Sequence, residues 1–174
     1  MLGVLFILTK AQAFCLDMIV AVLIFGAAIL IYYKTVTNLS PQDEALLNDI
    51  LIDAKSISGS LMSMGYPYNW TKDNVVRIGI TNNNRINETK LEQFSKIPYK
   101  DSRKLFGTAY DYYVFFRDRN NNIMPFNESL EGIGKPGVNS TNIQIIENPK
   151  KLVKVTRLII RKSDIAKMVV YLWY

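Results

Sequence analysis

Residues Met18 to Tyr33 read MIVAVLIFGAAILIYY, a run without a charged side chain. From Ala11 to Tyr33 the one charged residue is Asp17. A helix of that length extends about 34 Å, at about 1.5 Å per residue, and so exceeds a hydrocarbon core of about 30 Å. The run ends in Tyr32, Tyr33 and Lys34, which are typical of a membrane interface. A cleaved secretory signal has a shorter apolar region of about 7–15 residues, so the sequence predicts a membrane-spanning helix.

The composition limits the chemistry of the rest of the chain. The 174 residues are 49% hydrophobic and 21% charged, with a formal net charge of +6, which is consistent with one domain and an appendage. The chain has no histidine and a single cysteine, which excludes an intramolecular disulfide and a Cys-based structural zinc site. Asp118, Asn120 and Asn122 begin like a calcium loop, but the glycine and glutamate that follow in such loops are missing. We therefore expect no enzyme, cofactor or metal.

A second helix is expected after the span. Ser40 is placed to cap it and Pro41 to occupy its first turn. Apolar residues then recur every three or four positions, while acidic and polar residues occupy most of the other faces. The apolar positions are Leu47, Ile50, Leu51, Ala54, Ile57, Leu61 and Met64. This pattern predicts an amphipathic helix of about 24 residues that begins after a kink or break and lies against a sheet.

The remaining residues read as short strands with one helical insert. Strands are expected at 75–80, 109–118, 123–126, 152–161 and 166–173, with turns at 82–84, 120–122 and 162–164. Asn87 is expected to cap a short helix over 88–97, and another turn or two of helix is expected at 102–106, whereas 131–142 is expected to be a loop. In the aromatic strand, one alternate set of side chains is expected in the core and the other is expected to be partly covered by neighbouring subunits, with an exposed adhesion patch as the alternative. The predicted fold class is α+β, a long transmembrane helix continuing into an amphipathic helix on a small, mainly antiparallel sheet.

The residues before the span add a more specific signal. Lys10-Ala11-Gln12 is followed by Asp17 and then by the unbroken apolar helix. This order resembles the class III signal peptide of archaeal type IV pilin-like proteins. The resemblance implies that a prepilin peptidase cuts between Ala11 and Gln12 and leaves the helix on the mature protein. It also implies that Asp17 receives the new α-amino group of a neighbouring subunit during assembly.

Three other readings of this N-terminal region stay open or are disfavoured. Asp17 lies five residues after Gln12, one more than is usual in the family, so cleavage before Ala13 or Phe14 is an alternative. An uncut signal anchor is a second alternative. Lipidation of Cys15 is disfavoured because Phe14, a large residue, precedes it.

Asparagine sequons indicate which side of the membrane the head occupies. Four candidates for N-glycosylation follow the span at Asn69, Asn87, Asn127 and Asn139, and a poorer one at Asn38 adjoins it. Because such sites serve surface loops of secreted proteins, they favour an extracytoplasmic head over asparagine-rich turns with incidental hydroxyls.

These signals predict a leader at 1–11, a transmembrane and assembly helix at 12–37, and an extracytoplasmic head at 38–174, the lollipop layout of pilins. The expected function is a pilin, minor pilin or pseudopilin, a structural subunit of a cell-surface filament. The expected partners are the membrane, the prepilin peptidase, other pilin-like subunits and the pilus assembly platform. Nucleic acid is not expected, because the basic residues are scattered along the chain. The alternative is an uncleaved, signal-anchored extracellular binding or adhesion domain.

Overall fold

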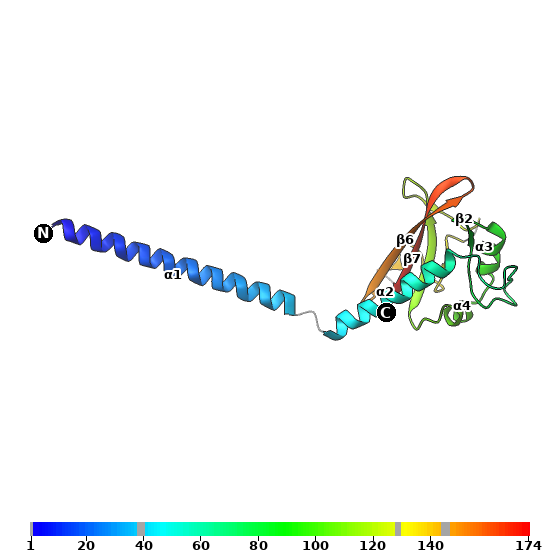
Figure 1. Ribbon diagram of the computed structural model, residues 1–174, viewed down its shortest axis with the longest axis horizontal. Coiled ribbons are helices and arrows are strands. Elements are labelled where there is room, and N and C mark those ends of the chain that lie inside the picture. The colour runs from blue at the N-terminus through cyan, green and yellow to red at the C-terminus, as the bar shows by residue number, and fades with distance from the viewer. Residues whose placement is uncertain (1, 38–40, 128–129, 144–146) are drawn as a thin grey trace. The chain divides into compact units, whose positions relative to one another are not determined.

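The structure, a computed structural model, describes residues 2–37, 41–127, 130–143 and 147–174 (Figure 1). The chain divides into two compact units, Met1–Glu44 and Ala45–Tyr174. We call the second unit the head. Ser40, the expected helix cap, and Asn38, the poorest sequon, lie outside the described residues.

The first unit contains the long apolar helix expected from the sequence. Helix α1 spans Leu2–Thr37 and includes a 22-residue stretch, Phe14–Thr35, with a mean hydropathy of 2.7. None of that stretch is buried within the protein, and its length and composition would allow it to cross a membrane. The helix is continuous through Lys10, Ala11 and Gln12.

Helix α2, Pro41–Leu61, is the predicted amphipathic helix. Ile50, Ala54, Ile57 and Leu61 are all at most 1% exposed, and their spacing of three and four residues puts them on one face. The helix ends three residues before Met64, which is 41% exposed and contributes little to that face.

Seven strands within the described residues form one curled, mixed sheet in the order β1-β2-β6-β7-β3-β4, with β5 paired to β3. They are β1 (Thr81–Asn82), β2 (Arg85–Ile86), β3 (Asp111–Arg117), β4 (Ile123–Met124), β5 (Gly132–Gly134), β6 (Leu152–Arg161) and β7 (Asp164–Trp173). All described pairs are antiparallel except β2 with β6, which meet at Arg85 and Ile160. The α+β class is therefore confirmed, and the sheet is mainly antiparallel.

The β6–β7 hairpin forms the centre of the sheet and was predicted almost to the residue. Lys162 and Ser163 make a two-residue turn with φ values of 51° and 70°, so Asp164 already belongs to β7. Such positive values suit the tight turns that connect twisted strands. The orange and red arrows in Figure 1 show this hairpin, with α2 lying alongside it.

The two faces of β3 and β7 carry separate apolar clusters, because successive strand side chains point to opposite sides. One face packs against α2 through Tyr112, Val114, Phe116, Met168, Val170 and Leu172. The other face presents Tyr113, Phe115, Val169 and Trp173 to Val138 and Ile143 of the chain's own 135–143 loop. The expectation that neighbouring subunits cover the second aromatic set is therefore wrong, since Phe115 is fully buried within this chain.

Two short helices follow the first pair of strands. Helix α3, Glu88–Ser95, is capped by Asn87, whose side chain accepts a hydrogen bond from the Lys90 backbone N–H, as predicted. Helix α4 spans Tyr99–Phe106 and begins three residues earlier than expected, directly after Pro98. It ends at Gly107, whose φ of 69° suits glycine at a helix C-terminus.

The predicted strand at 75–80 is wrong. Ile78 and Ile80 are fully buried, as an apolar strand would be. The backbone there forms an isolated antiparallel bridge, between Arg77 and Tyr66, and Ile80 bonds to the end of α2 and to Asn87. The Ile80 N–H donates to the carbonyl of Leu61, and the Ile78 carbonyl accepts from the Ser60 hydroxyl. The last carbonyls of a helix lack partners within the helix, so this extended segment satisfies one of them.

The predicted loop at 131–142 contains strand β5, which is the second correction. Glycine makes this pairing possible, because a Cβ at Gly134 would lie 2.2 Å from the Tyr112 carbonyl oxygen and one at Gly132 2.5 Å from that of Val114. The glycines that suggested an irregular loop therefore allow β5 to approach β3 closely.

Candidate functional site

The residues predicted for processing and assembly all lie in α1. Lys10, Ala11 and Gln12 belong to the continuous helix, and Asp17 lies exposed on it, five residues beyond Gln12. Asp17 is the one charged residue between Phe14 and Tyr33.

The exposed face around Asp17 is made mainly of small and aliphatic side chains. At about 100° per residue, Asp17 shares one helix face with Ala21, Ile24, Ala28 and Ile31, which follow at alternating spacings of four and three. Gly26 lies on the opposite side, so the small residues near Asp17 are alanines. A second helix could approach this face closely, because the alanine side chains do not keep the backbones apart.

The predicted glycosylation sites are spread over the head. Asn69, Asn87 and Asn127 are exposed, and Asn139 is half-buried. The oxygen of each of the last three side chains accepts a backbone N–H: Asn87 from Lys90, Asn127 from Leu130 and Asn139 from Thr141 and Asn142. Ser129, the hydroxyl residue of the Asn127 sequon, lies outside the described residues.

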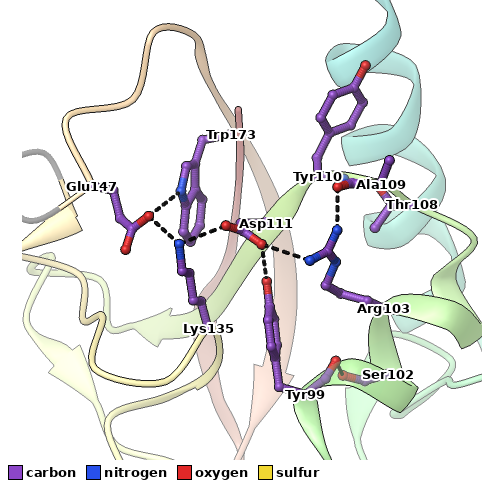
Figure 2. A network of polar contacts seen from close by, with 10 residues as sticks. All are labelled: Tyr99, Ser102, Arg103, Thr108, Ala109, Tyr110, Asp111, Lys135, Glu147 and Trp173. Atoms are coloured by element: carbon purple, nitrogen blue, oxygen red, sulfur yellow. Dashed lines mark hydrogen bonds and ion pairs between the residues drawn. The ribbon is translucent and has the colours of Figure 1, made fainter.

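The head also contains a network of charged side chains that the sequence did not predict (Figure 2). Asp111, at the start of β3, accepts hydrogen bonds from the Tyr99 hydroxyl at 2.6 Å and from Arg103 at 3.1 Å, both on α4. Its other oxygen lies 2.8 Å from the Lys135 Nζ. Lys135 in turn pairs with Glu147, which also accepts from the Trp173 indole N–H at 3.4 Å.

The electrostatics of this network are balanced, with two acids and two bases. Burial on its own raises the pKa of Asp111, but the hydrogen bonds from Lys135 and Tyr99 and the charges of Lys135 and Arg103 outweigh burial and lower it. Hydrogen bonds to Asp111 and Glu147 raise the pKa of Lys135. Burial, followed by the neighbouring Asp111 carboxylate, raises the pKa of Tyr99. The network therefore holds α4, β3, β7 and the loop after β5 together, with Asp111 ionised and Lys135 protonated near neutral pH.

A second buried charge joins the hairpin turn to α3. Arg161 is 2% exposed, and its guanidinium bonds both carboxylate oxygens of Glu88, at 3.0 and 3.2 Å, and the carbonyls of Pro125 and Phe126. It also lies 5.0 Å from the centre of the Phe116 ring. Its donors are thus well satisfied, which is the condition under which a buried arginine is tolerated.

The acids of the two networks and of the Asp118 turn are not grouped as metal ligands in the part of the chain that the structure describes. Among the residues that the structure describes, no group of three or more His, Cys, Asp and Glu side chains is placed to hold a metal ion. The predicted turn near Asp118 is a hydrogen-bonded loop, in which the carboxylate accepts from the backbone and side chain of Asn122. A surface pocket of about 490 Å³ adjoins the Asp111 network and is lined by Tyr99, Ile133 and Lys135 among others.

Local signals for these networks were weak. Asp111 stands in an otherwise aromatic strand, which marks it as an acid that needs a partner, but Lys135 and Glu147 are 24 and 36 residues away. Comparison of the chain with protein-family models, with curated proteins and with solved structures found no match.

Proposed function

We propose that this chain is a type IV pilin-like structural subunit of an archaeal cell-surface filament. In this proposal a prepilin peptidase removes the leader, the mature subunit is stored in the membrane by α1, and an assembly platform inserts it into the filament. The observation that carries the proposal is α1 itself. Its 22-residue apolar stretch, Phe14–Thr35, is not buried by any described part of the protein, and the single acid of the helix, Asp17, lies near the start of that stretch.

The exposure of α1 suits a segment with two environments. A membrane surrounds the helix with acyl chains before assembly, and neighbouring helices surround it in a filament. Lipid tails are as apolar as leucine side chains, so the exchange costs little hydrophobic free energy, and packing and polar contacts decide the association. If α1 is cut between Ala11 and Gln12, its remaining 26 residues extend about 39 Å, which still spans a bilayer.

Asp17 supplies the polar contact. A carboxylate at the centre of a bilayer costs about 2.5–3.5 kcal/mol on insertion scales, and a position near the membrane surface lowers that cost. Cleavage creates an α-amino group with an ordinary pKa near 8, which is mostly protonated at neutral pH. Pairing Asp17 with the amine of a neighbouring subunit compensates both charges and sets the relative position of adjacent helices.

The head supports the same assignment. Its amphipathic helix, α2, packs on a mainly antiparallel sheet, an arrangement that supports the proposal. Three of its four sequon asparagines are exposed, which suits a glycan-bearing, extracytoplasmic domain. In this layout the α1 helix anchors the protein in the membrane and the head is extracellular.

The N-terminus of the protein purified from native membranes tests the proposal. N-terminal sequencing and intact mass should give Gln12, or Ala13 or Phe14 if the cut is displaced. A chain that keeps Met1 and runs as a monomer would refute the proposal and would indicate a signal-anchored binding domain instead.

Substitution of Asp17 tests the assembly step separately from processing. Asp17→Ala should leave membrane insertion and cleavage unchanged but reduce filament number by at least tenfold, because the neighbouring α-amino group loses its partner. Asp17→Glu, which keeps the charge, should retain most filaments. Normal filaments from Asp17→Ala, counted by electron microscopy, would reject the role of this residue.

A further inference from the structure

The hairpin has a face that no part of the described head covers fully. The 135–143 loop covers the half of this face that carries Tyr113, Phe115 and Trp173. Toward the turn, Leu158 is 66% exposed and Ile165 47% exposed. Large apolar side chains exposed side by side on a sheet are typical of an interaction surface.

This uncovered face is also basic. Strand alternation and the pairing of Leu158 with Lys167 and of Ile160 with Ile165 put Lys154, Leu158, Ile165 and Lys167 on one side of the hairpin. We call these four residues the hairpin face. Arg117 of β3 pairs with Lys167 in register and extends the positive charge, and Asp118 is the acid at its rim.

The outer side of helix α2 carries an exposed apolar residue with an acid beside it. This side is centred on Ile52, which is 56% exposed although it belongs to a helix whose other face is buried. Asp49 lies one turn before Ile52 and is exposed. Within the head, α2 carries two acids, Asp49 and the half-buried Asp53, and one base, Lys55, and Asp53 accepts a hydrogen bond from the Thr108 hydroxyl.

One chain cannot bring these two surfaces together, because α2 packs on the opposite face of the sheet from Leu158 and Lys167. We propose that the hairpin face binds the outer face of α2, around Ile52 and Asp49, of a second copy of this chain. Leu158 and Ile165 then pack against Ile52, while Lys154 meets Asp49. The other end of the contact pairs opposite charges as well. Lys55, about one turn after Ile52 on α2, meets Asp118, which directly follows the last residue of β3.

The contact joins two different surfaces, so each subunit keeps one of each free after pairing. A heterologous contact of this kind propagates into rings or open helical assemblies and does not stop at a dimer. The inference rests on the proposed function in that it takes the chain to assemble with its own copies. It adds which parts of the head meet.

Disulfide cross-linking of the full chain in native membranes and filaments tests the contact. Cys15 is the single cysteine and is replaced by serine, so that Ile52→Cys and Leu158→Cys are the only thiols. Oxidation of this double variant should give a ladder of dimers, trimers and larger species that reduction removes. A matched control pairs Ile52→Cys with Lys104→Cys, an α4 position whose side chain is 80% exposed, and should give no ladder.

Charge reversal tests the chemistry of the same contact. In the cross-linking background, Lys154→Glu should lower the ladder about threefold to fivefold, the range expected for one exposed ion pair, and adding Asp49→Lys should restore it to within twofold. Lys104→Glu should change nothing. Because these side chains are exposed, the tryptophan fluorescence of the head should stay unchanged in all variants.

Several results would overturn the inference. An equal ladder from the Lys104 pair would show that the contact lacks specificity, and dimers from Leu158→Cys alone would show a symmetric hairpin-to-hairpin contact. If the Ile52→Cys, Leu158→Cys variant gives no ladder, and Lys154→Glu abolishes binding of the chain to anionic vesicles or to nucleic acid, the hairpin face would be assigned to those partners instead. Filaments without a ladder would reject the contact and leave the proposed function standing. A chain that keeps Met1 and yields no oligomer with an amine-reactive cross-linker would reject the proposed function itself.

Discussion

Replacing Asp111 by asparagine should destabilise the head by about 2 kcal/mol at pH 7. The carboxylate accepts hydrogen bonds from Tyr99, Arg103 and Lys135 at 2.6–3.1 Å, and its side chain is 25% exposed. Hydrogen bonds to charged groups contribute about 1.5–3 kcal/mol each. Asparagine keeps the size and one acceptor oxygen, and water reaches part of the site, so the net loss of unfolding free energy is about that of one such bond.

The pH dependence of this loss distinguishes charge from shape. Hydrogen bonds and nearby positive charges lower the pKa of Asp111 in the folded head against the opposing effect of burial. In an unfolded chain an aspartate titrates near pH 3.9. Stability gained from the ionised carboxylate is therefore fully present above about pH 5 and is lost as the pH falls through the lower, folded-state value. The difference between wild type and Asp111→Asn should be constant from pH 6 to 8 and shrink below about pH 4.

Denaturant unfolding of the full chain in detergent, followed by tryptophan fluorescence, measures this difference. Both tryptophans, Trp70 and Trp173, are 2% exposed and lie in the head, so the signal reports head unfolding. Asp101→Asn is the matched control, since Asp101 is 57% exposed and lies 3.8 Å from Lys104, and it should cost less than about 0.5 kcal/mol. Equal losses at Asp111 and Asp101, or a difference that grows in acid, would refute the reasoning.

Two further predictions concern glycine contacts and a helix cap. Gly134→Ala should lower the unfolding free energy by about 1–3 kcal/mol because its Cβ meets the β3 backbone, whereas Gly59→Ala in α2, with no atom within 4 Å, should raise it by about 0.5–1 kcal/mol. The reverse order in the same unfolding assay would contradict the β5–β3 pairing. Asn87→Ala should cost about 1 kcal/mol through loss of the α3 cap, and Asn87→Asp should cost far less. Equal destabilisation by Asn87→Ala and Asn87→Asp would reject the capping role. If Asn87 carries a glycan, mass spectrometry of the native protein should show that both variants lack the mass of that glycan.

Patterns with a short period were enough to predict much of the head. The spacing of Ile50, Ala54, Ile57 and Leu61 identified the buried face of α2, because a helix repeats every 3.6 residues. The unbroken apolar run from Met168 to Trp173 identified a strand buried on both faces. The N-cap at Asn87 was likewise visible, since its partner, the Lys90 N–H, lies three residues away.

Predictions failed where the partner of a segment lay far along the chain. Residues 75–80 have the composition of a strand, yet their hydrogen bonds go to the end of α2, to Tyr66 and to Asn87, and they join no strand of the sheet. Gly132 and Gly134 look like loop residues until β3 lies beside them.

The amino-acid order alone established the apolar α1 helix with its one acid, the amphipathic α2 helix and the β6–β7 hairpin, because each depends on contacts or patterns within a few turns of chain. The folded head added the partners of Asp111 and Arg161, the burial of Phe115 under the 135–143 loop, and the placement of α2 and the basic hairpin face on opposite sides of the sheet. These features join residues tens of positions apart. Their energies depend on distance and burial in three dimensions, which no local pattern of residues encodes.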